Sequence, residues 1–112
     1  MAVISRSSPF GSVARTRVLL ALHLLSESYA RELSRLIGMS LAGVQDALRS
    51  LERDGLVAAR TVGRSRVYQI EPRYFAKTDL EKFLARLIEG EPELRATIAS
   101  SRRRPRRTGK PA

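Results

Sequence analysis

A chain of 112 residues is long enough for one domain with one modest core. It carries a net charge of +10 and no cysteine, which excludes disulfides, thiolate metal sites and a cysteine nucleophile. No stretch approaches the ~20 apolar residues of a membrane span, and the opening MAVISRSSPFG has no apolar run of signal-peptide length. We therefore expect a cytoplasmic protein.

The positive charge is unevenly distributed along the chain. Six basic residues and no acidic residue lie from Arg102 onward, and without this tail the net charge falls to +4. A positive balance favours a polyanionic partner, either nucleic acid or an anionic membrane surface. The alternative is that the arginine content only reflects an arginine-rich genome.

The first predicted element is a helix that follows a loose lead-in over residues 1–11. Ser12 can cap this helix, which we expect to run to about Leu25. Its apolar residues form one stripe of Ala14, Val18, Ala21, Leu22 and Leu25, with Val13, Leu20 and Leu24 roughly opposite. A surface helix of a monomer normally has one apolar stripe. The second stripe therefore needs a cover.

Two further helices follow the loop 26–28. The first is about eight residues long, turns Leu33, Leu36 and Ile37 inward, and ends at Gly38. Ser40 can cap the second, whose inward residues Val44, Ala47, Leu48 and Leu51 have helical spacing, and which ends at Gly55. The short turn GMS between them is typical of a helix-turn-helix.

A β-hairpin is predicted next, with strands 56–61 and 66–70 and a turn over residues 62–65. Gly63 supplies the positive φ that the turn needs. Arg64 and Arg66 flank Ser65 at the tip, and because strand residues i and i+2 share a face, their guanidinium groups are expected to point the same way. Pro72 ends the pairing.

The C-terminal part is predicted to hold two helices and a basic tail. The first starts at Thr78, where Thr78 and Glu81 fit a capping box, and ends at Gly90. Pro92 can open a last short helix to about Ser100. We expect residues 102–112 to be disordered, because Arg, Pro, Gly and Lys cannot bury a core.

The stretch YARELSRLIGMSLAGVQDALRSLERDGLVAARTVGRSRVYQI closely resembles the winged-helix regulators of the ArsR-like group. The matching features are REL before an apolar helix, G-x-S at the turn, V-x-x-x-L-x-x-LE-x-x-GLV, and GR-x-R-x-Y-x-I. With the first helix, the resemblance covers about residues 10–75.

The resemblance implies a mainly α fold with a small β-hairpin in the order α-α-α-β-β-α. It implies a winged helix-turn-helix over residues 12–75, with C-terminal helices over 76–101 that serve dimerisation. It also implies binding of double-stranded DNA as a homodimer and control of transcription as a repressor.

Candidate DNA contacts lie on the recognition helix, about residues 40–54, and on the wing, about residues 60–68. Gln45 could bond adenine, and Arg49 could reach guanine or a phosphate, although Arg49 and Arg53 could also be solvated charges. Asp46 departs from a basic surface and could pair with either arginine. The alternative for Arg64 and Arg66 is that they are solvated charges on an exposed turn and do not contact DNA. The full set is Ser40, Leu41, Ala42, Gly43, Gln45, Arg49, Arg53, Arg60, Arg64, Ser65 and Arg66.

A dimer interface is expected where the second stripe of the first helix meets the apolar face of the helix at 78–89 of another copy. The candidate residues are Val13, Leu20, Leu24, Leu80, Phe83, Leu84, Leu87 and Ile88. The alternative is that the helix at 78–89 folds back over the second stripe within one chain.

Metal sensing is common in the ArsR-like group, but here cysteine is absent and His23 has only Glu27 as a nearby acid. We predict no metal site, no cofactor and membership of a non-metal-sensing subgroup. No catalytic constellation appears, so we do not expect an enzyme. Two alternatives stay open: a winged-helix module for protein interaction or assembly, and non-specific nucleic-acid binding through the basic tail.

Overall fold

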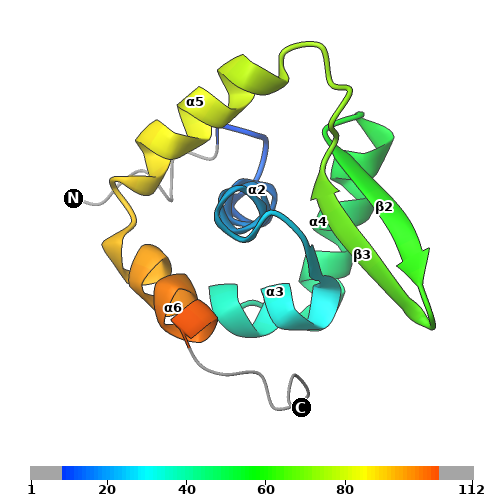
Figure 1. Ribbon diagram of the computed structural model, residues 1–112, viewed down its shortest axis with the longest axis horizontal. Coiled ribbons are helices and arrows are strands. Elements are labelled where there is room, and N and C mark those ends of the chain that lie inside the picture. Colours follow the sequence, from blue (N-terminus) through cyan, green and yellow to red (C-terminus); the bar gives the residue numbers. More distant parts are fainter. Residues whose placement is uncertain (1–8, 104–112) are drawn as a thin grey trace.

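The computed structural model describes residues 9–103, and these form a mainly α fold with a small sheet, as predicted (Figure 1). The elements in chain order are α2 (Val13–Leu25), β1 (Ser28–Tyr29), α3 (Ala30–Ile37), α4 (Leu41–Arg53), β2 (Val57–Val62), β3 (Ser65–Ile70), α5 (Lys77–Ile88) and α6 (Pro92–Arg103). Strand β1 was not predicted, because two residues are too few to show an alternating pattern.

Helix α2 is the centre of the fold. Figure 1 views it nearly end-on, with α5, α6, α3 and the hairpin arranged around it and α4 packed behind the sheet. The consecutive residues 18–22 are all at most 1% exposed. A helix that is apolar on several faces is stable when neighbours cover all of them. Leu20 of the second stripe is therefore covered from within the same chain.

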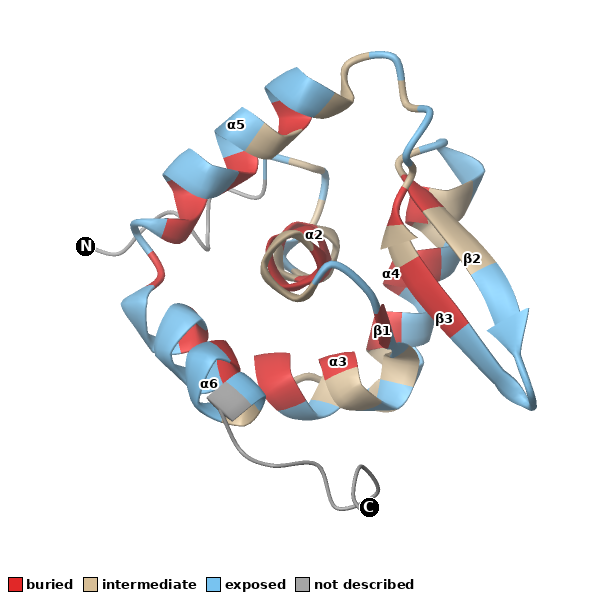
Figure 2. Cartoon of the chain, viewed as in Figure 1, coloured by how far each residue is buried: buried red, intermediate tan, exposed pale blue. Residues whose placement is uncertain are grey.

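Helix α5 supplies part of that cover, and this corrects the predicted dimer interface. Figure 2 shows buried positions on both α2 and α5. Five of the eight residues predicted for the interface are buried in the single chain: Leu20, Leu80, Leu84, Leu87 and Ile88. The apolar stripe of α5 packs on α2, because burying both faces against each other removes apolar surface from water without a second chain. Of the other three, Val13 is 37% exposed, Phe83 is 44% exposed, and Leu24 is partly buried.

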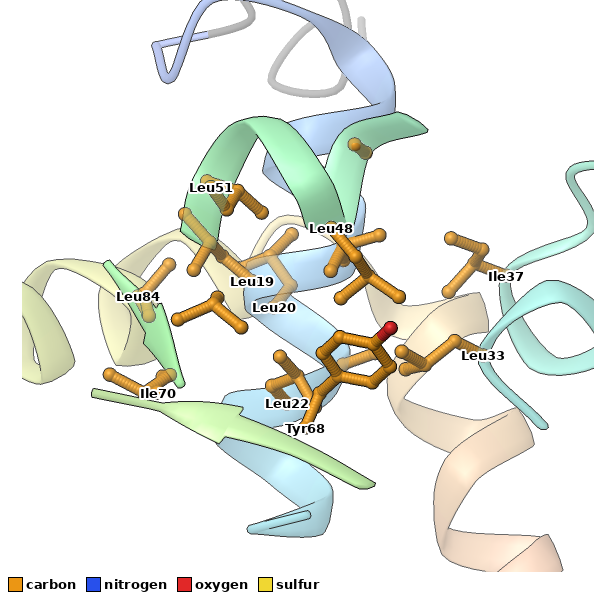
Figure 3. Close-up of a cluster of buried hydrophobic side chains, with 14 of the residues drawn as sticks. Leu19, Leu20, Leu22, Leu33, Ile37, Leu48, Leu51, Tyr68, Ile70 and Leu84 are labelled. Carbon is orange, nitrogen blue, oxygen red and sulfur yellow. The ribbon is translucent and has the colours of Figure 1, made fainter. Parts of the chain in front are cut away.

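The remaining core joins α2 to the helix-turn-helix and the sheet (Figure 3). Leu33 from α3 and Leu48 and Leu51 from α4 are fully buried against it. Tyr68 from β3 is 8% exposed and belongs to the same cluster, so its ring covers the core. This packing sets the position of α4 and of the base of the hairpin.

The sheet has the strand order β1-β3-β2, and both pairings are antiparallel. The β2–β3 register runs from Val57 opposite Ile70 to Val62 opposite Ser65. Only residues 63 and 64 remain for the turn, so it is shorter than predicted. Gly63 has φ +63° there, the left-handed conformation that a two-residue hairpin turn requires.

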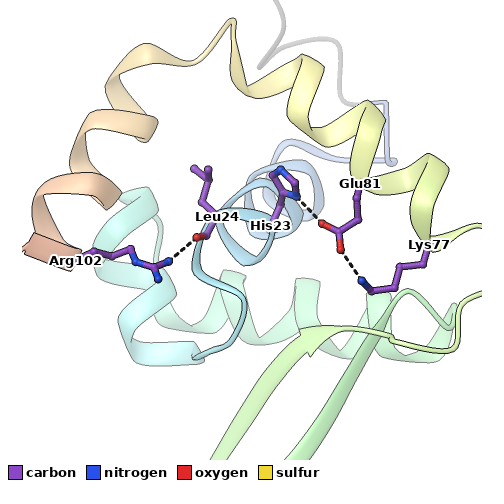
Figure 4. Close-up of polar contacts among 5 residues, drawn as sticks. All are labelled: His23, Leu24, Lys77, Glu81 and Arg102. Carbon is purple, nitrogen blue, oxygen red and sulfur yellow. Dashed lines mark hydrogen bonds and ion pairs between the residues drawn. The ribbon is translucent and has the colours of Figure 1, made fainter.

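The predicted capping box at Thr78 and Glu81 is not formed. Helix α5 begins one residue earlier, at Lys77, and the residue before it makes no side-chain capping bond. Glu81 instead lies 2.6 Å from Nδ1 of His23 and accepts a 2.7 Å hydrogen bond from Nζ of Lys77 (Figure 4). The tertiary partner on α2 thus takes the carboxylate that local sequence assigned to the cap.

Helix α6 is longer than predicted and includes the first two residues of the expected tail. It starts at Pro92 as predicted but continues to Arg103. Nη1 of Arg102 donates to the backbone oxygen of Leu24 at 2.6 Å, where α2 ends (Figure 4). Residues 104–112, and residues 1–8 of the predicted lead-in, lie outside the described residues.

Candidate nucleic-acid interface

The turn between α3 and α4 has the geometry that the sequence predicts. Gly38 ends α3 with φ +69°, and its N–H bonds to the oxygen of Ser34. Ser40 caps α4, because its Oγ accepts a 3.0 Å hydrogen bond from the N–H of Gly43. The start of α4 is therefore well defined.

Gly43 has a role that sequence reasoning did not identify. A Cβ at this position would lie 3.1 Å from Oγ of Ser40, which is closer than ordinary van der Waals contact. Glycine therefore leaves room for the cap, in addition to being a candidate DNA contact in the first turn of α4. No pattern in the sequence distinguishes these two reasons for a glycine in a first turn.

The outer face of α4 presents polar side chains at the surface. Gln45, Asp46, Arg49 and Arg53 are exposed, whereas Val44, Ala47, Leu48 and Leu51 are buried on the opposite face. Ala42 is exposed beside them, and Leu41 and Gly43 are partly exposed. The predicted recognition face is thus at the surface, and its contacts to DNA remain predictions.

Arg15 anchors the other end of α4, and sequence reasoning assigned it no role. Its Nε donates to the oxygen of Phe10 at 2.6 Å, its Nη1 donates to Oγ of Ser50, and its Nη2 lies 2.9 Å from Oδ2 of Asp54. The side chain is only 17% exposed. An arginine at this depth fixes the last turn of α4 on α2, since several directional bonds converge on one planar group.

Three of the five candidate arginines are paired with carboxylates of the same chain. Arg49 pairs with Asp46, for which the sequence left Arg49 and Arg53 as possible partners. Arg60 lies 2.8 Å from Glu27, and Arg66 lies 2.8 Å from Glu52. Within residues 9–103, Arg53 and Arg64 have no ion-pair partner.

The predicted matched pair of wing arginines is not supported by the geometry. Arg64 occupies the turn, where the alternation of strand side chains does not apply, and Arg66 is engaged by α4. The pairing of β2 and β3 extends one residue closer to the tip on each strand than predicted, to Val62 opposite Ser65, which places Arg64 at the very tip. The two arginines therefore have different surroundings.

Neither a metal-binding cluster nor a membrane-spanning helix occurs in the described part of the chain. No group of three or more His, Cys, Asp or Glu side chains there is arranged to hold a metal ion. No helix of residues 9–103 is long and apolar enough to cross a bilayer.

The helix-turn-helix followed by a hairpin, packed on a central helix, defines a winged-helix fold. The fold is similar to that of AntR, an antimony-specific transcriptional repressor, with 22% identity, a TM-score of 0.58, and coverage of 74% of this chain and 73% of that one. It is also similar to the adhesin competence repressor AdcR from Streptococcus pyogenes, with 17% identity, a TM-score of 0.54, and coverage of 88% and 69%. No family model and no curated protein matches the sequence.

Proposed function

We propose that the chain is a winged-helix regulator of transcription that binds double-stranded DNA and acts as a repressor. The observation that carries this proposal is an exposed polar face on α4 beside an arginine-tipped wing, in a fold that two transcriptional repressors share. A recognition helix of this kind enters the major groove, and a wing contacts the backbone or the minor groove.

The proposed contacts follow from exposure and charge. Gln45 can read adenine and Arg53 can reach a phosphate, while Ser40 and the first N–H groups of α4 favour an anion. Arg49 is proposed to contact DNA only after releasing Asp46, because one guanidinium cannot satisfy both anions fully. Arg64 at the tip is proposed as the principal wing contact.

A titration of a random duplex, followed by fluorescence anisotropy across a salt series, tests this function. We expect salt-dependent binding that weakens in Arg53→Ala and in Arg64→Ala, with Arg86→Ala on α5 as the control. A chain lacking residues 104–112 measures the share of the basic tail and leaves α6 intact.

Two outcomes would contradict the proposal. If no duplex binds at any salt concentration, the winged helix serves as a protein-interaction or assembly module. If the shortened chain loses all binding, the basic tail is the nucleic-acid-binding element. If the shortened chain does bind the duplex, sequencing of genomic fragments recovered with the protein identifies the targets.

We further propose a homodimer, with an interface that differs from the one expected from sequence. Of the eight residues predicted for the interface, Val13 and Phe83 stay exposed and Leu24 is partly so, and Phe83 packs against Phe10 in a tilted arrangement with ring centroids 5.7 Å apart. A stable interface needs about 800 Å² from each partner, so surrounding residues of α2 and α5 must contribute.

Size-exclusion chromatography with light scattering tests the dimer. The wild-type chain is expected to be dimeric at micromolar concentration, and Phe83→Glu is expected to be monomeric. Phe75→Glu serves as the control, because Phe75 is 93% exposed and lies outside α5. A monomeric wild-type protein, or a dimeric Phe83→Glu variant that melts normally, would refute this interface.

The proposal also includes a cytoplasmic location, no catalytic activity and no metal cofactor. Without cysteine, a thiophilic ion would have to use other donors in this chain. Addition of Zn²⁺ or antimonite to the duplex titration is expected to leave the affinity unchanged, and a reproducible shift would contradict the non-metal-sensing assignment.

A further inference from the structure

Glu52 connects the last turn of α4 to the wing. Its Oε2 lies 2.8 Å from Nη2 of Arg66, and its side chain is 30% exposed compared with 54% for Arg66. The guanidinium carbon of Arg66 lies 5.9 Å from the ring centroid of Tyr68, which is itself part of the core. Arg66 is therefore held by an anion on one helix and by an aromatic face on its own strand.

The position of Arg66 in the sheet makes this contact mechanically important. Strand β1 pairs with β3 only at Tyr68 and Val67, so the third strand supports the hairpin no further than Val67. Residues 61–66 beyond it are all exposed and form a two-stranded ribbon. An isolated ribbon of this kind is marginally stable at best. The Glu52–Arg66 pair joins this ribbon to α4 just past the point where β1 ends.

We infer that Glu52 is a positioning residue that docks the wing on the recognition helix and withholds Arg66 from phosphate, which leaves Arg64 as the wing contact to DNA. This inference rests on the proposed function. It assigns different roles to two arginines that are two residues apart.

The chemistry of the competing anions supports this division of roles. A carboxylate and a phosphate oxygen accept the same guanidinium hydrogen bonds, so Arg66 can bind phosphate fully only by releasing Glu52. The released carboxylate would then stand close to the negative DNA backbone. The negative charge of Glu52 also raises the pKa of Arg66, so the guanidinium keeps its positive charge. Arg64 has no such partner in the described chain.

The salt dependence of duplex binding separates the two arginines. Each phosphate contact contributes about 0.9 to the slope of log affinity against log salt concentration. We expect Arg64→Ala to reduce that slope by about one contact, and Arg66→Ala to change it little. Glu52→Gln is expected to steepen it by about one contact, and the Glu52→Gln/Arg66→Ala double variant to return it to the wild-type value.

Glu89→Gln is the matched control for a gain of one positive charge, since Glu89 pairs with Arg86 on α5 away from the wing. It is expected to leave the slope unchanged. The inference is overturned if Arg66→Ala flattens the slope as much as Arg64→Ala does, or if Glu52→Gln behaves as wild type. Failure of the wild-type chain to bind any duplex would instead overturn the proposed function.

Amide hydrogen exchange tests the docking without DNA. In Glu52→Gln the amides of residues 61–66 are expected to exchange several-fold faster, while those at the base of the hairpin, residues 57–58 and 69–70, keep their rates. Equal exchange across the whole hairpin would overturn the docking role. A melting temperature close to that of wild type confirms that the variant is folded.

Discussion

The arginines of this chain show that one residue type serves different roles according to its neighbours. Arg15 is largely buried and fixes the end of α4 through Ser50 and Asp54. Arg66 is half-exposed and tied to Glu52, whereas Arg64 lies in an exposed turn. Local sequence does not separate these roles, because the carboxylate partners are 14 residues away for Arg66 and 39 for Arg15. Only the partners of each guanidinium show which arginines are available to a ligand.

Ser40 is a residue whose effect can be measured directly. Ser40→Ala removes the oxygen that accepts from the N–H of Gly43, so we expect the free energy of unfolding to fall by about 1 kcal/mol. Urea denaturation measures this change. Ser100→Ala, an exposed position on α6, is the control and should differ little from wild type. An unchanged midpoint for Ser40→Ala would show that the cap contributes nothing to stability.

Glu81 predicts the response of the fold to acid. Burial tends to raise the pKa of its carboxyl, but the hydrogen bonds and positive charges of Lys77 and His23 outweigh burial, so the pKa lies below its ordinary value of about 4.5. A lowered folded-state pKa stabilises the fold above pH 4.5 or so, and this stability is lost as the pH falls through the folded-state pKa.

The matching experiment compares melting temperatures from neutral pH down to about pH 3. Glu81→Gln is expected to lose less stability than wild type over the acid part of this range, because glutamine does not titrate. Glu93→Gln, at an exposed position on α6, should follow the wild-type curve. Parallel curves for wild type and Glu81→Gln would contradict a contribution from this carboxylate.

At the scale of elements, α5 is the clearest case where packing overrides expectation. Its spacing of apolar residues predicted a helix correctly, but the same spacing is compatible with packing on another copy or on the same chain. In the structure, α5 packs on α2 of the same chain, and Leu84 is fully buried. Helix α5 is thus part of the core of a single chain.

This placement predicts the effect of shortening Leu84. Leu84→Ala is expected to lower the free energy of unfolding by about 2–5 kcal/mol, through lost burial and the cavity left behind. The loss should be independent of protein concentration, because no second chain is involved. Phe83→Ala, at a half-exposed neighbour, should cost less. A loss for Leu84→Ala that shrinks as protein concentration rises would indicate an intermolecular role.

At the scale of the whole molecule, the proposed dimer determines how two recognition helices meet DNA. Two copies related by a two-fold axis present two equivalent α4 helices to two inverted half-sites. Helices on one side of the duplex require half-sites about 34–36 Å apart, which is one helical turn. Footprinting on a recovered genomic fragment should therefore protect two inverted half-sites with that separation. A single protected half-site would indicate that one chain binds alone.

Much of the fold was accessible from sequence because its signals are local. Capping by Ser12 and Ser40, the stop at Gly38 and the glycine turn at Gly63 involve residues within a few positions of one another. The exposed face of α4 also followed from helical spacing. Strand β1, the true partner of Glu81 and the extension of α6 to Arg103 did not, since each depends on contacts between distant segments.

The sequence by itself determined the element order, the turn of the helix-turn-helix and the position of an arginine-tipped wing. Periodicity and turn chemistry are properties of neighbouring residues, so one chain suffices to predict them. The tertiary structure alone decided that α5 covers α2 within the same chain, and that Glu52 engages Arg66 while Arg64 is left at the tip. Burial and ion pairing depend on which distant surfaces meet, and that is settled only when the whole chain packs around α2.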